Sequence, residues 1–322
     1  MTGIPLGKGA EFDRIRAIAG ALGADASALG NDTAVLPPGF GEVVLSTDLS
    51  VEGVHFRREW LGWEEIGWRA ASGALSDLAA AGAEVVGLTA SIGAPAGEPA
   101  DHLVALMRGV GAAARSVGGK VLGGDLSRAP AWVVDVTVVG RTAKPMGRVG
   151  ARPGDGLWVT GSLGGARAAL LAWEQGGVPA VGARERFARP VARIAEGRWL
   201  AAHGATAMMD ISDGLGGDVG HLAAASGVRI DVDLEQIPVH PDAVAMALAR
   251  QEPLQAFAAR GGEDYELLVC LPKAVGVDEA TRFQRDTGTR LSRIGRIRRG
   301  SGVAATFAGV PTELAGGHDH FA

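Results

Sequence analysis

Apolar residues form two kinds of pattern along the chain. In some segments they recur at helical spacing, and in others they form short runs that are continuous or alternate with polar residues. Helical spacing predicts helices over residues 11–22, 64–81, 101–117, 165–175, 190–202 and 277–286, with another after Asp213. Apolar runs bounded by turn residues predict strands over residues 42–48, 85–92, 131–141, 157–160, 206–210, 228–234, 265–271 and 291–297. Helices and strands that alternate in this way indicate the α/β class.

A turn-rich joint divides this pattern. Residues 149–156 contain three glycines and a proline, and a new strand follows them. The chain has 322 residues, which at roughly 150 residues per domain also favours two domains. We therefore predict an N-terminal domain over residues 1–149 and a C-terminal domain over residues 150–322.

Charge and composition exclude several classes of protein. Lys plus Arg is 31 and Asp plus Glu is 36, a net charge of −5, which argues against a nucleic-acid partner bound through its phosphates. Hydrophobic residues make up 47% and charged residues 21%, so wholesale disorder is excluded. The most apolar stretch, residues 78–94, is interrupted by Glu84 and is too short to span a membrane. The N-terminal residues lack the apolar core of a signal peptide.

Cysteine usage agrees with a cytoplasmic protein. Cys270 is the one cysteine of the chain and lies in an apolar run. It has no partner for a disulfide bond or a thiolate zinc site. We expect a protein of the reducing cytoplasm that neither crosses a membrane nor is secreted.

Candidate chemistry comes from aspartates that are locally unsuited to burial. Asp77 lies in an apolar helix, and no Lys or Arg occurs from Ala70 to Met107. Its carboxylate must face water, meet a distant partner or bind a cation. Asp48 and Asp125 are expected at the ends of strands, where ligands of α/β sheets collect, although either residue could serve only in a turn or as a helix cap.

Two further aspartates, Asp210 and Asp213, enclose a short turn before a predicted helix, and Asp213 is also a candidate N-cap. Carboxylates without thiols or paired histidines favour magnesium over zinc. A magnesium site in turn suggests a polyphosphate ligand. The usual Gly-x4-Gly-Lys-Ser/Thr and Gly-x-Gly-x-x-Gly motifs are missing, so neither a P-loop kinase nor a plain dinucleotide enzyme is indicated.

Together these segments, in their order along the chain, resemble the thiamine-monophosphate kinase family, which belongs to the superfamily of aminoimidazole ribonucleotide synthetase. The segments Val-Glu-Gly-Val-His-Phe and Gly-Gly-Glu-Asp-Tyr-Glu-Leu favour this family over its relatives. The matching segments are residues 10–12, 30–32, 46–56, 75–83, 123–125, 210–215 and 261–267.

The resemblance implies a fold and an activity. The fold is a two-domain α/β arrangement of the α+β type, like that of aminoimidazole ribonucleotide synthetase, with mixed sheets flanked by helices. The N-terminal domain would carry the site for ATP and magnesium together with a homodimer interface. The activity would be transfer of the γ-phosphoryl group of ATP to thiamine monophosphate, with several Mg²⁺ ions as cofactors.

Residue roles follow from the same resemblance. His55 and Glu263 would contact thiamine monophosphate, and Asp210, Asp213 and Arg148 would act in catalysis. Residues implied for ATP binding are Gly124, Asp125, Arg148 and Ser212. Residues implied as magnesium ligands, directly or through water, are Asp32, Ser46, Thr47, Asp48, Asp77, Asp125, Asp210 and Asp213.

Plainer interpretations stay open for several of these residues. His55 could be structural, Arg148 could be a solvated linker residue, and Glu263 with Asp264 could form a solvated turn. Ala315 and His318 stand where the family usually has an aromatic residue and a tyrosine, which leaves the acceptor open. Other hypotheses are a superfamily enzyme acting on another phosphorylated small molecule, or a non-catalytic nucleotide-binding dimer.

Overall fold

The computed structural model describes residues 10–26, 36–314 and 317. These residues form two compact units. The first unit contains the described residues up to Leu78, Ala83–Ala143 and Ala188–Pro190. The second unit contains Ala79–Gly82, Lys144–Phe187 and the described residues from Val191 onward. The predicted boundary at residues 149/150 follows shortly after the change of unit at Ala143.

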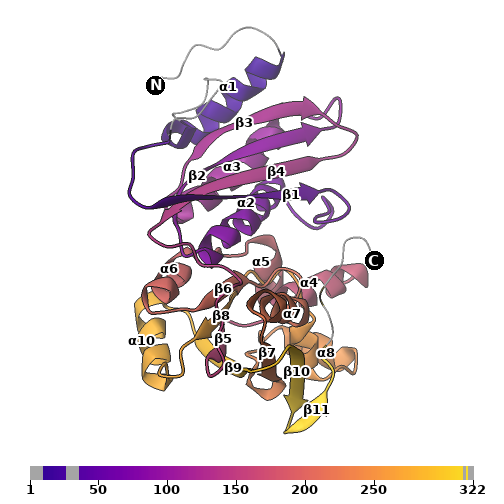
Figure 1. Cartoon of the computed structure of the whole chain (residues 1–322). Coiled ribbons are helices and arrows are strands. Elements are labelled where there is room, and N and C mark those ends of the chain that lie inside the picture. Colours follow the sequence, from indigo (N-terminus) through magenta and orange to yellow (C-terminus); the bar gives the residue numbers. More distant parts are fainter. Residues whose placement is uncertain (1–9, 27–35, 315–316, 318–322) are drawn as a thin grey trace. The chain divides into compact units, whose positions relative to one another are not determined.

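The first unit is built on a four-stranded sheet with the order β1-β4-β2-β3 (Figure 1). The pairs β1–β4 and β4–β2 are antiparallel, whereas β2 and β3 are parallel and are connected through a helix. The elements are α1 (Ala10–Leu22), η1 (Gly23–Ala26), β1 (Glu42–Val51), α2 (Trp63–Ala80), β2 (Glu84–Ala94), α3 (Ala100–Ser116), β3 (Val121–Arg128) and β4 (Val133–Thr142).

Helices α2 and α3 lie against one face of this sheet (Figure 1). Val134, Val136 and Val138 of β4 are fully buried on that face. The two helices approach closely because Gly67 and Gly109 stand at their contact. A Cβ on either glycine would lie 1.9 Å from a carbonyl oxygen of the other helix, so any side chain there would separate the helices.

The second unit contains a seven-stranded sheet with the order β11-β10-β7-β9-β5-β8-β6. Its pairs are antiparallel except for β10–β7. The strands are β5 (Gly156–Thr160), β6 (Ala207–Asp210), β7 (Arg229–Asp233), β8 (Leu267–Leu271), β9 (Leu291–Arg298), β10 (Gly302–Phe307) and β11 (Val310–Thr312). The helices are α4 (Gly165–Glu174), α5 (Val181–Ala188), α6 (Ile194–Ala202), α7 (Leu215–Ser226), η2 (Leu234–Gln236), α8 (Ala243–Ala249), α9 (Leu254–Ala259) and α10 (Val277–Thr287).

The core of this unit lies between the sheet and helix α7. Leu215, Val219 and Leu222 of α7 pack in one cluster with Val159 of β5 and Cys270 of β8. Burial raises the pKa of the Cys270 thiol well above its ordinary range. Cys270 is therefore a core residue, and its thiol stays protonated.

The predicted α/β class with mixed sheets is confirmed, but several elements differ from the prediction. The strand expected to end at Asp125 continues to Arg128 as β3. Gly124 is within the strand, where a Cβ would lie 2.0 Å from the Ala90 carbonyl oxygen. The helix predicted from residue 190 begins only at Ile194. Elements that were missed are α5, α8, α9, β10 and β11. Within the described chain, no helix is long and apolar enough to cross a membrane.

Candidate functional site

Three of the predicted metal-site residues gather on the helix-covered face of the first sheet. Ser46 and Asp48 are two positions apart on β1, so both point to the same face. Asp77 of α2 lies against this face, and the Ser46 hydroxyl donates a hydrogen bond to its carboxylate. Asp77 thus has a polar partner from a distant part of the chain. The prediction that Asp48 ends its strand is wrong, because β1 continues to Val51.

Thr47 and Asp125 lie on the opposite face. The Thr47 hydroxyl donates to Asp135 at 2.7 Å. Asp125 is also within a strand rather than at its end. In the sheet, Asp125 of β3 is aligned with Ser91 of β2, and Ser91 is aligned with Asp135 of β4. Strand alternation therefore separates the side chains of Thr47 and Asp125 from those of Ser46, Asp48 and Asp77.

His55 lies in a tight turn after β1. Its Nδ1 accepts a hydrogen bond from the Val51 N–H at 3.1 Å, and its carbonyl oxygen accepts one from Arg69 at 3.4 Å. The ring is half-buried. These contacts fix the orientation of the imidazole, which suits either a structural residue or a ligand contact. Asp32, Ala315 and His318 lie outside the described residues.

In the second unit, the turn between β6 and α7 carries Asp210, Ser212 and Asp213. Asp210 ends β6 and is buried. Asp213 was a candidate N-cap, but the N-cap of α7 is Gly214, and no side chain caps the helix. Gly214 has φ 108°, a conformation that glycine adopts without strain. Asp213 is thereby left outside the helix.

Backbone hydrogen bonds join this turn to the segment that carries Glu263. The Glu263 N–H donates to the Ser212 carbonyl at 2.6 Å, and the Tyr265 N–H donates to the Ile211 carbonyl at 2.9 Å. These bonds extend the antiparallel pairing of β6 with β8. Glu263 and Tyr265 have φ values of 62° and 49°. The loop therefore holds Glu263 beside Ser212 in a backbone conformation that non-glycine residues seldom adopt.

Asp218, in the first turn of α7, belongs to the same neighbourhood. Burial, together with the charges of Asp210 and Asp213, raises its pKa to about 8, while the charge of Arg148 opposes this shift. Arg148, Asp210, Asp213 and Asp218 are therefore close enough to interact. The sequence analysis missed Asp218, although the signal resembles that of Asp77, since no Lys or Arg occurs between Arg198 and Arg229.

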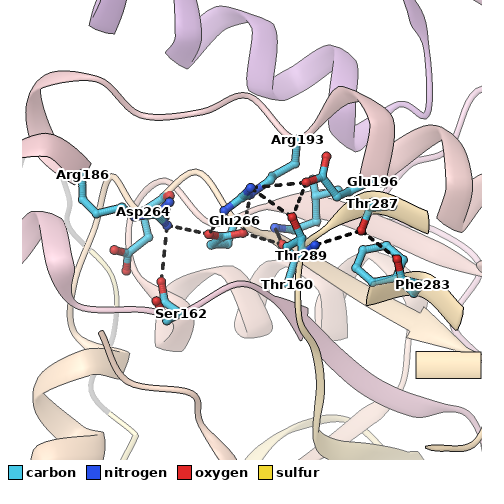
Figure 2. Close-up of polar contacts among 11 residues, drawn as sticks. Thr160, Ser162, Arg186, Arg193, Glu196, Asp264, Glu266, Phe283, Thr287 and Thr289 are labelled. Carbon is cyan, nitrogen blue, oxygen red and sulfur yellow. Dashed lines mark hydrogen bonds and ion pairs between the residues drawn. The ribbon is translucent and has the colours of Figure 1, made fainter. Parts of the chain in front are cut away.

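A buried ionic network is centred on Glu266, three residues after Glu263 (Figure 2). Glu266 is fully buried and accepts hydrogen bonds from Arg186 and from Arg193, the latter at 2.6 and 2.8 Å. The Thr160 hydroxyl donates to the same carboxylate at 2.7 Å. Burial alone would raise the pKa of Glu266, but the two guanidinium groups lower it to about 2.

Asp264 points into the same interior. Its carboxylate accepts the Gly164 N–H at 2.9 Å, and its carbonyl oxygen accepts a hydrogen bond from Arg186 at 3.2 Å. Burial raises its pKa to about 7, although Arg186 and the Gly164 N–H oppose the shift. The interpretation of Asp264 as a solvated turn residue is wrong.

Sequence profiles of two domains match the chain. The "AIR synthase related protein, N-terminal domain" matches residues 30–142, and the "AIR synthase related protein, C-terminal domain" matches residues 152–307. A thiamine-monophosphate kinase of Mycobacterium tuberculosis is 37% identical over 244 residues, which cover 75% of this chain and 73% of the relative. The chain belongs to the thiamine-monophosphate kinase family. This membership confirms the resemblance and the expected two-domain fold.

Solved structures agree with the family. The crystal structure of a thiamine-monophosphate kinase from Stenotrophomonas maltophilia is 34% identical and aligns with a TM-score of 0.80 over 93% of this chain and 96% of its own. The structure "AaThiL complexed with AMPPCP and TMP" is 31% identical and aligns with a TM-score of 0.79 over both whole chains.

The metal ligands expected of a thiamine-monophosphate kinase can be tested against the donor groups present. In the parts of the chain described, no three His, Cys, Asp or Glu side chains are grouped so that they could hold a metal ion. The donors around Asp210 are nevertheless carboxylate oxygens, which suit Mg²⁺. The Oδ2 atom of Asp218 is buried without a hydrogen-bond partner, so this acceptor is left to interact with a cation. The donor chemistry therefore fits Mg²⁺.

Proposed function

We propose that this chain transfers the γ-phosphoryl group of ATP to thiamine monophosphate, giving thiamine diphosphate and ADP. The observation that carries this proposal is the end-to-end alignment with a family member solved in complex with AMPPCP and TMP. The family segments around Asp48, Asp77, Asp210 and Glu263 are all present in this chain.

Oxygen donors are proposed as metal ligands in each unit. Asp48, Asp77, Asp210 and Asp213 would hold Mg²⁺, and the family assignment adds Asp32, Ser46, Thr47 and Asp125. Bound Mg²⁺ would reduce the repulsion between the two phosphate-bearing substrates. The carboxylates themselves would set the positions of the ions, directly or through water.

The other assigned residues bind and orient. Arg148, together with Gly124, Asp125 and Ser212, would contact ATP, and the Arg148 guanidinium would offset developing negative charge. His55 and Glu263 would contact thiamine monophosphate. Because a phosphate monoester has a second pKa of about 6, the acceptor is largely ionised at neutral pH. The reaction therefore needs no strong general base, and positioning supplies most of the catalysis.

We also propose that the enzyme is a cytoplasmic homodimer. Val43, Leu45 and Leu49 of β1 are exposed by 48%, 69% and 53%. They share the sheet face opposite α2 and α3, and β1 is an edge strand. Apolar residues gathered on an exposed edge strand favour an interface with a second copy. The net charge and the single buried cysteine favour a cytoplasmic enzyme without nucleic-acid or membrane partners.

The test is ADP formation from Mg-ATP with and without thiamine monophosphate, with the product identified by mass spectrometry. We expect thiamine diphosphate from the wild type and a fall in kcat of about 100-fold in Asp77→Asn, which removes a proposed metal ligand. Asp101→Asn, at an exposed position of α3 in the same unit, is the matched control and should leave kcat unchanged.

The outcomes separate the open hypotheses. ADP formation only with another phosphorylated small molecule would retain phosphoryl transfer and replace the acceptor. Nucleotide binding without turnover on any acceptor would favour the non-catalytic dimer. Full activity in Asp77→Asn would contradict the metal assignment in the first unit.

A further inference from the structure

Asp218 is a buried acid to which the proposed reaction gives no role. It occupies the first turn of α7 and is 1% exposed. Its Oδ2 atom has no hydrogen-bond partner. A buried carboxyl group with an unmatched oxygen lowers stability, since burial removes its hydration. Fold stability therefore does not account for Asp218.

The surroundings of Asp218 have an excess of negative charge. Asp210 and Asp213 both act on it with like charge, and Arg148 supplies the opposing charge. The helix offers no compensation, because no Lys or Arg occurs between Arg198 and Arg229. The carboxyl groups of Asp210, Asp213 and Asp218 thus share one neighbourhood, in which a bound divalent cation would be favourable. Two of the three carboxyl groups are already proposed as metal ligands.

We propose that Asp218 is a further residue of the metal site at Asp210 and Asp213, where its buried carboxyl group strengthens the binding of a divalent cation. Among the described residues no three such side chains are grouped in ligand geometry, so Asp218 acts from behind Asp210 and Asp213, through water. Such supporting groups commonly change metal affinity 10- to 100-fold. This inference rests on the proposed function.

A purely structural role would give different results. The backbone of Asp213 also interacts favourably with the Asp218 carboxylate, so Asp218 could serve only to hold the turn. Asparagine retains an acceptor oxygen for that contact but cannot ionise when a cation binds. Asp218→Asn therefore separates a role in holding the turn from a role in attracting a cation.

The experiment titrates the full chain with Mn²⁺ and follows the free ion by electron paramagnetic resonance. We expect Asp218→Asn to weaken Mn²⁺ binding at least tenfold, at the same class of sites that Asp210→Asn weakens. Asp155→Asn is the matched control. Asp155 is also a buried aspartate of the second unit, but Arg152 N–H and the Thr206 hydroxyl donate to it at 2.9 and 2.7 Å. The Mn²⁺ affinity of the Asp155→Asn variant should equal that of the wild type.

Thermal unfolding with and without Mn²⁺ provides the second readout. Metal-free Asp218→Asn should have a stability close to that of the wild type, because a buried polar group is replaced by one of the same size, and it should gain less from added Mn²⁺. Unchanged Mn²⁺ affinity in Asp218→Asn would overturn the inference, and so would failure of the metal-free variant to fold. If the wild type binds no Mn²⁺, the metal assignments of the proposed function fail as well, which distinguishes that result from a failure confined to Asp218.

Discussion

At the scale of single residues, two neighbouring buried acids illustrate how hydrogen-bond partners decide ionisation. Asp264 and Glu266 both lie near Arg186, yet the pKa of Asp264 is raised to about 7 and that of Glu266 is lowered to about 2. Glu266 has a second guanidinium, Arg193, and a hydroxyl on its carboxylate, whereas Oδ1 of Asp264 has no partner. Burial dominates where partners are few, and charge pairing dominates where they are many.

The raised pKa of Asp264 predicts that the stability of the protein depends on pH. Its folded-state pKa of about 7 lies above the ordinary 3.8, so between these values the folded state keeps a proton that the unfolded state releases. The free energy of unfolding should fall as pH rises through this range, by up to ~1.4 kcal/mol per pKa unit. Urea titrations across it should show a smaller fall for Asp264→Asn. Identical pH profiles for the two proteins would contradict the prediction.

Sequence reasoning identified some of these residues and missed others for a definite reason. Asp77 was recognised because no Lys or Arg occurs from Ala70 to Met107, and the same criterion would have found Asp218. Glu266 could not be recognised as buried, because Arg186 and Arg193 are 80 and 73 residues away along the chain. A local pattern shows where a charge lacks a near partner, but it does not show where the distant partner lies.

At the scale of elements, the β6–α7 turn and the Glu263 loop form one structure. Their backbone hydrogen bonds continue the β6–β8 pairing, and Glu266 anchors the loop just before β8 begins. Close packing restricts the loop further, since a Cβ on Gly262 would lie 2.8 Å from the Ser212 carbonyl oxygen. The position of Glu263 thus depends on contacts made on both sides of it in sequence.

Glu266→Gln tests this anchor. The change leaves Arg186 and Arg193 without their shared buried counter-charge, and breaking a buried ion pair in this way costs about 3 kcal/mol or more. Urea unfolding should show that loss. Glu279→Gln on α10 removes one of the two acidic partners of the exposed Arg282 and should change stability little. Equal stability of Glu266→Gln and the wild type would show that the network does not support the loop.

Elements with a long periodic pattern were predicted well, and short or glycine-rich ones were not. Helices α2 and α3 extend over 18 and 17 residues, and their boundaries differ from the prediction by one position at each end. Helices α8 and α9 have only 7 and 6 residues, too few for helical spacing to be distinct. Strand β3 was expected to end at Asp125, and its pairing with β2 as far as Arg128 is a long-range contact that leaves no local signal.

At the scale of the whole molecule, the order of family segments predicted the fold, but it did not predict how the chain is divided. Residues 79–82 belong to the second unit and residues 188–190 to the first, each apart from its sequence neighbours. The local composition of these two segments does not indicate that they belong to a different unit from their sequence neighbours. The boundary at residues 149/150 and the roles of the two domains stay predictions.

The proposed dimer can be tested on the first unit. In Leu45→Asp/Leu49→Asp, two exposed leucines on β1 become charged while the helix-covered face is unchanged. If these leucines are buried in a dimer, each contributes about 1.5 kcal/mol or more, so the dissociation constant should rise at least ~100-fold. Light scattering coupled to size-exclusion chromatography should then show a monomer.

Val178→Asp is the control for this dimer test, because Val178 is 91% exposed in the second unit and lies outside the proposed interface. It should keep the wild-type mass. A wild type that is monomeric at micromolar concentration would refute the homodimer itself. If the double variant is still a dimer, the interface does not lie on this face, because an interface would not tolerate a charge buried without a partner at each leucine position.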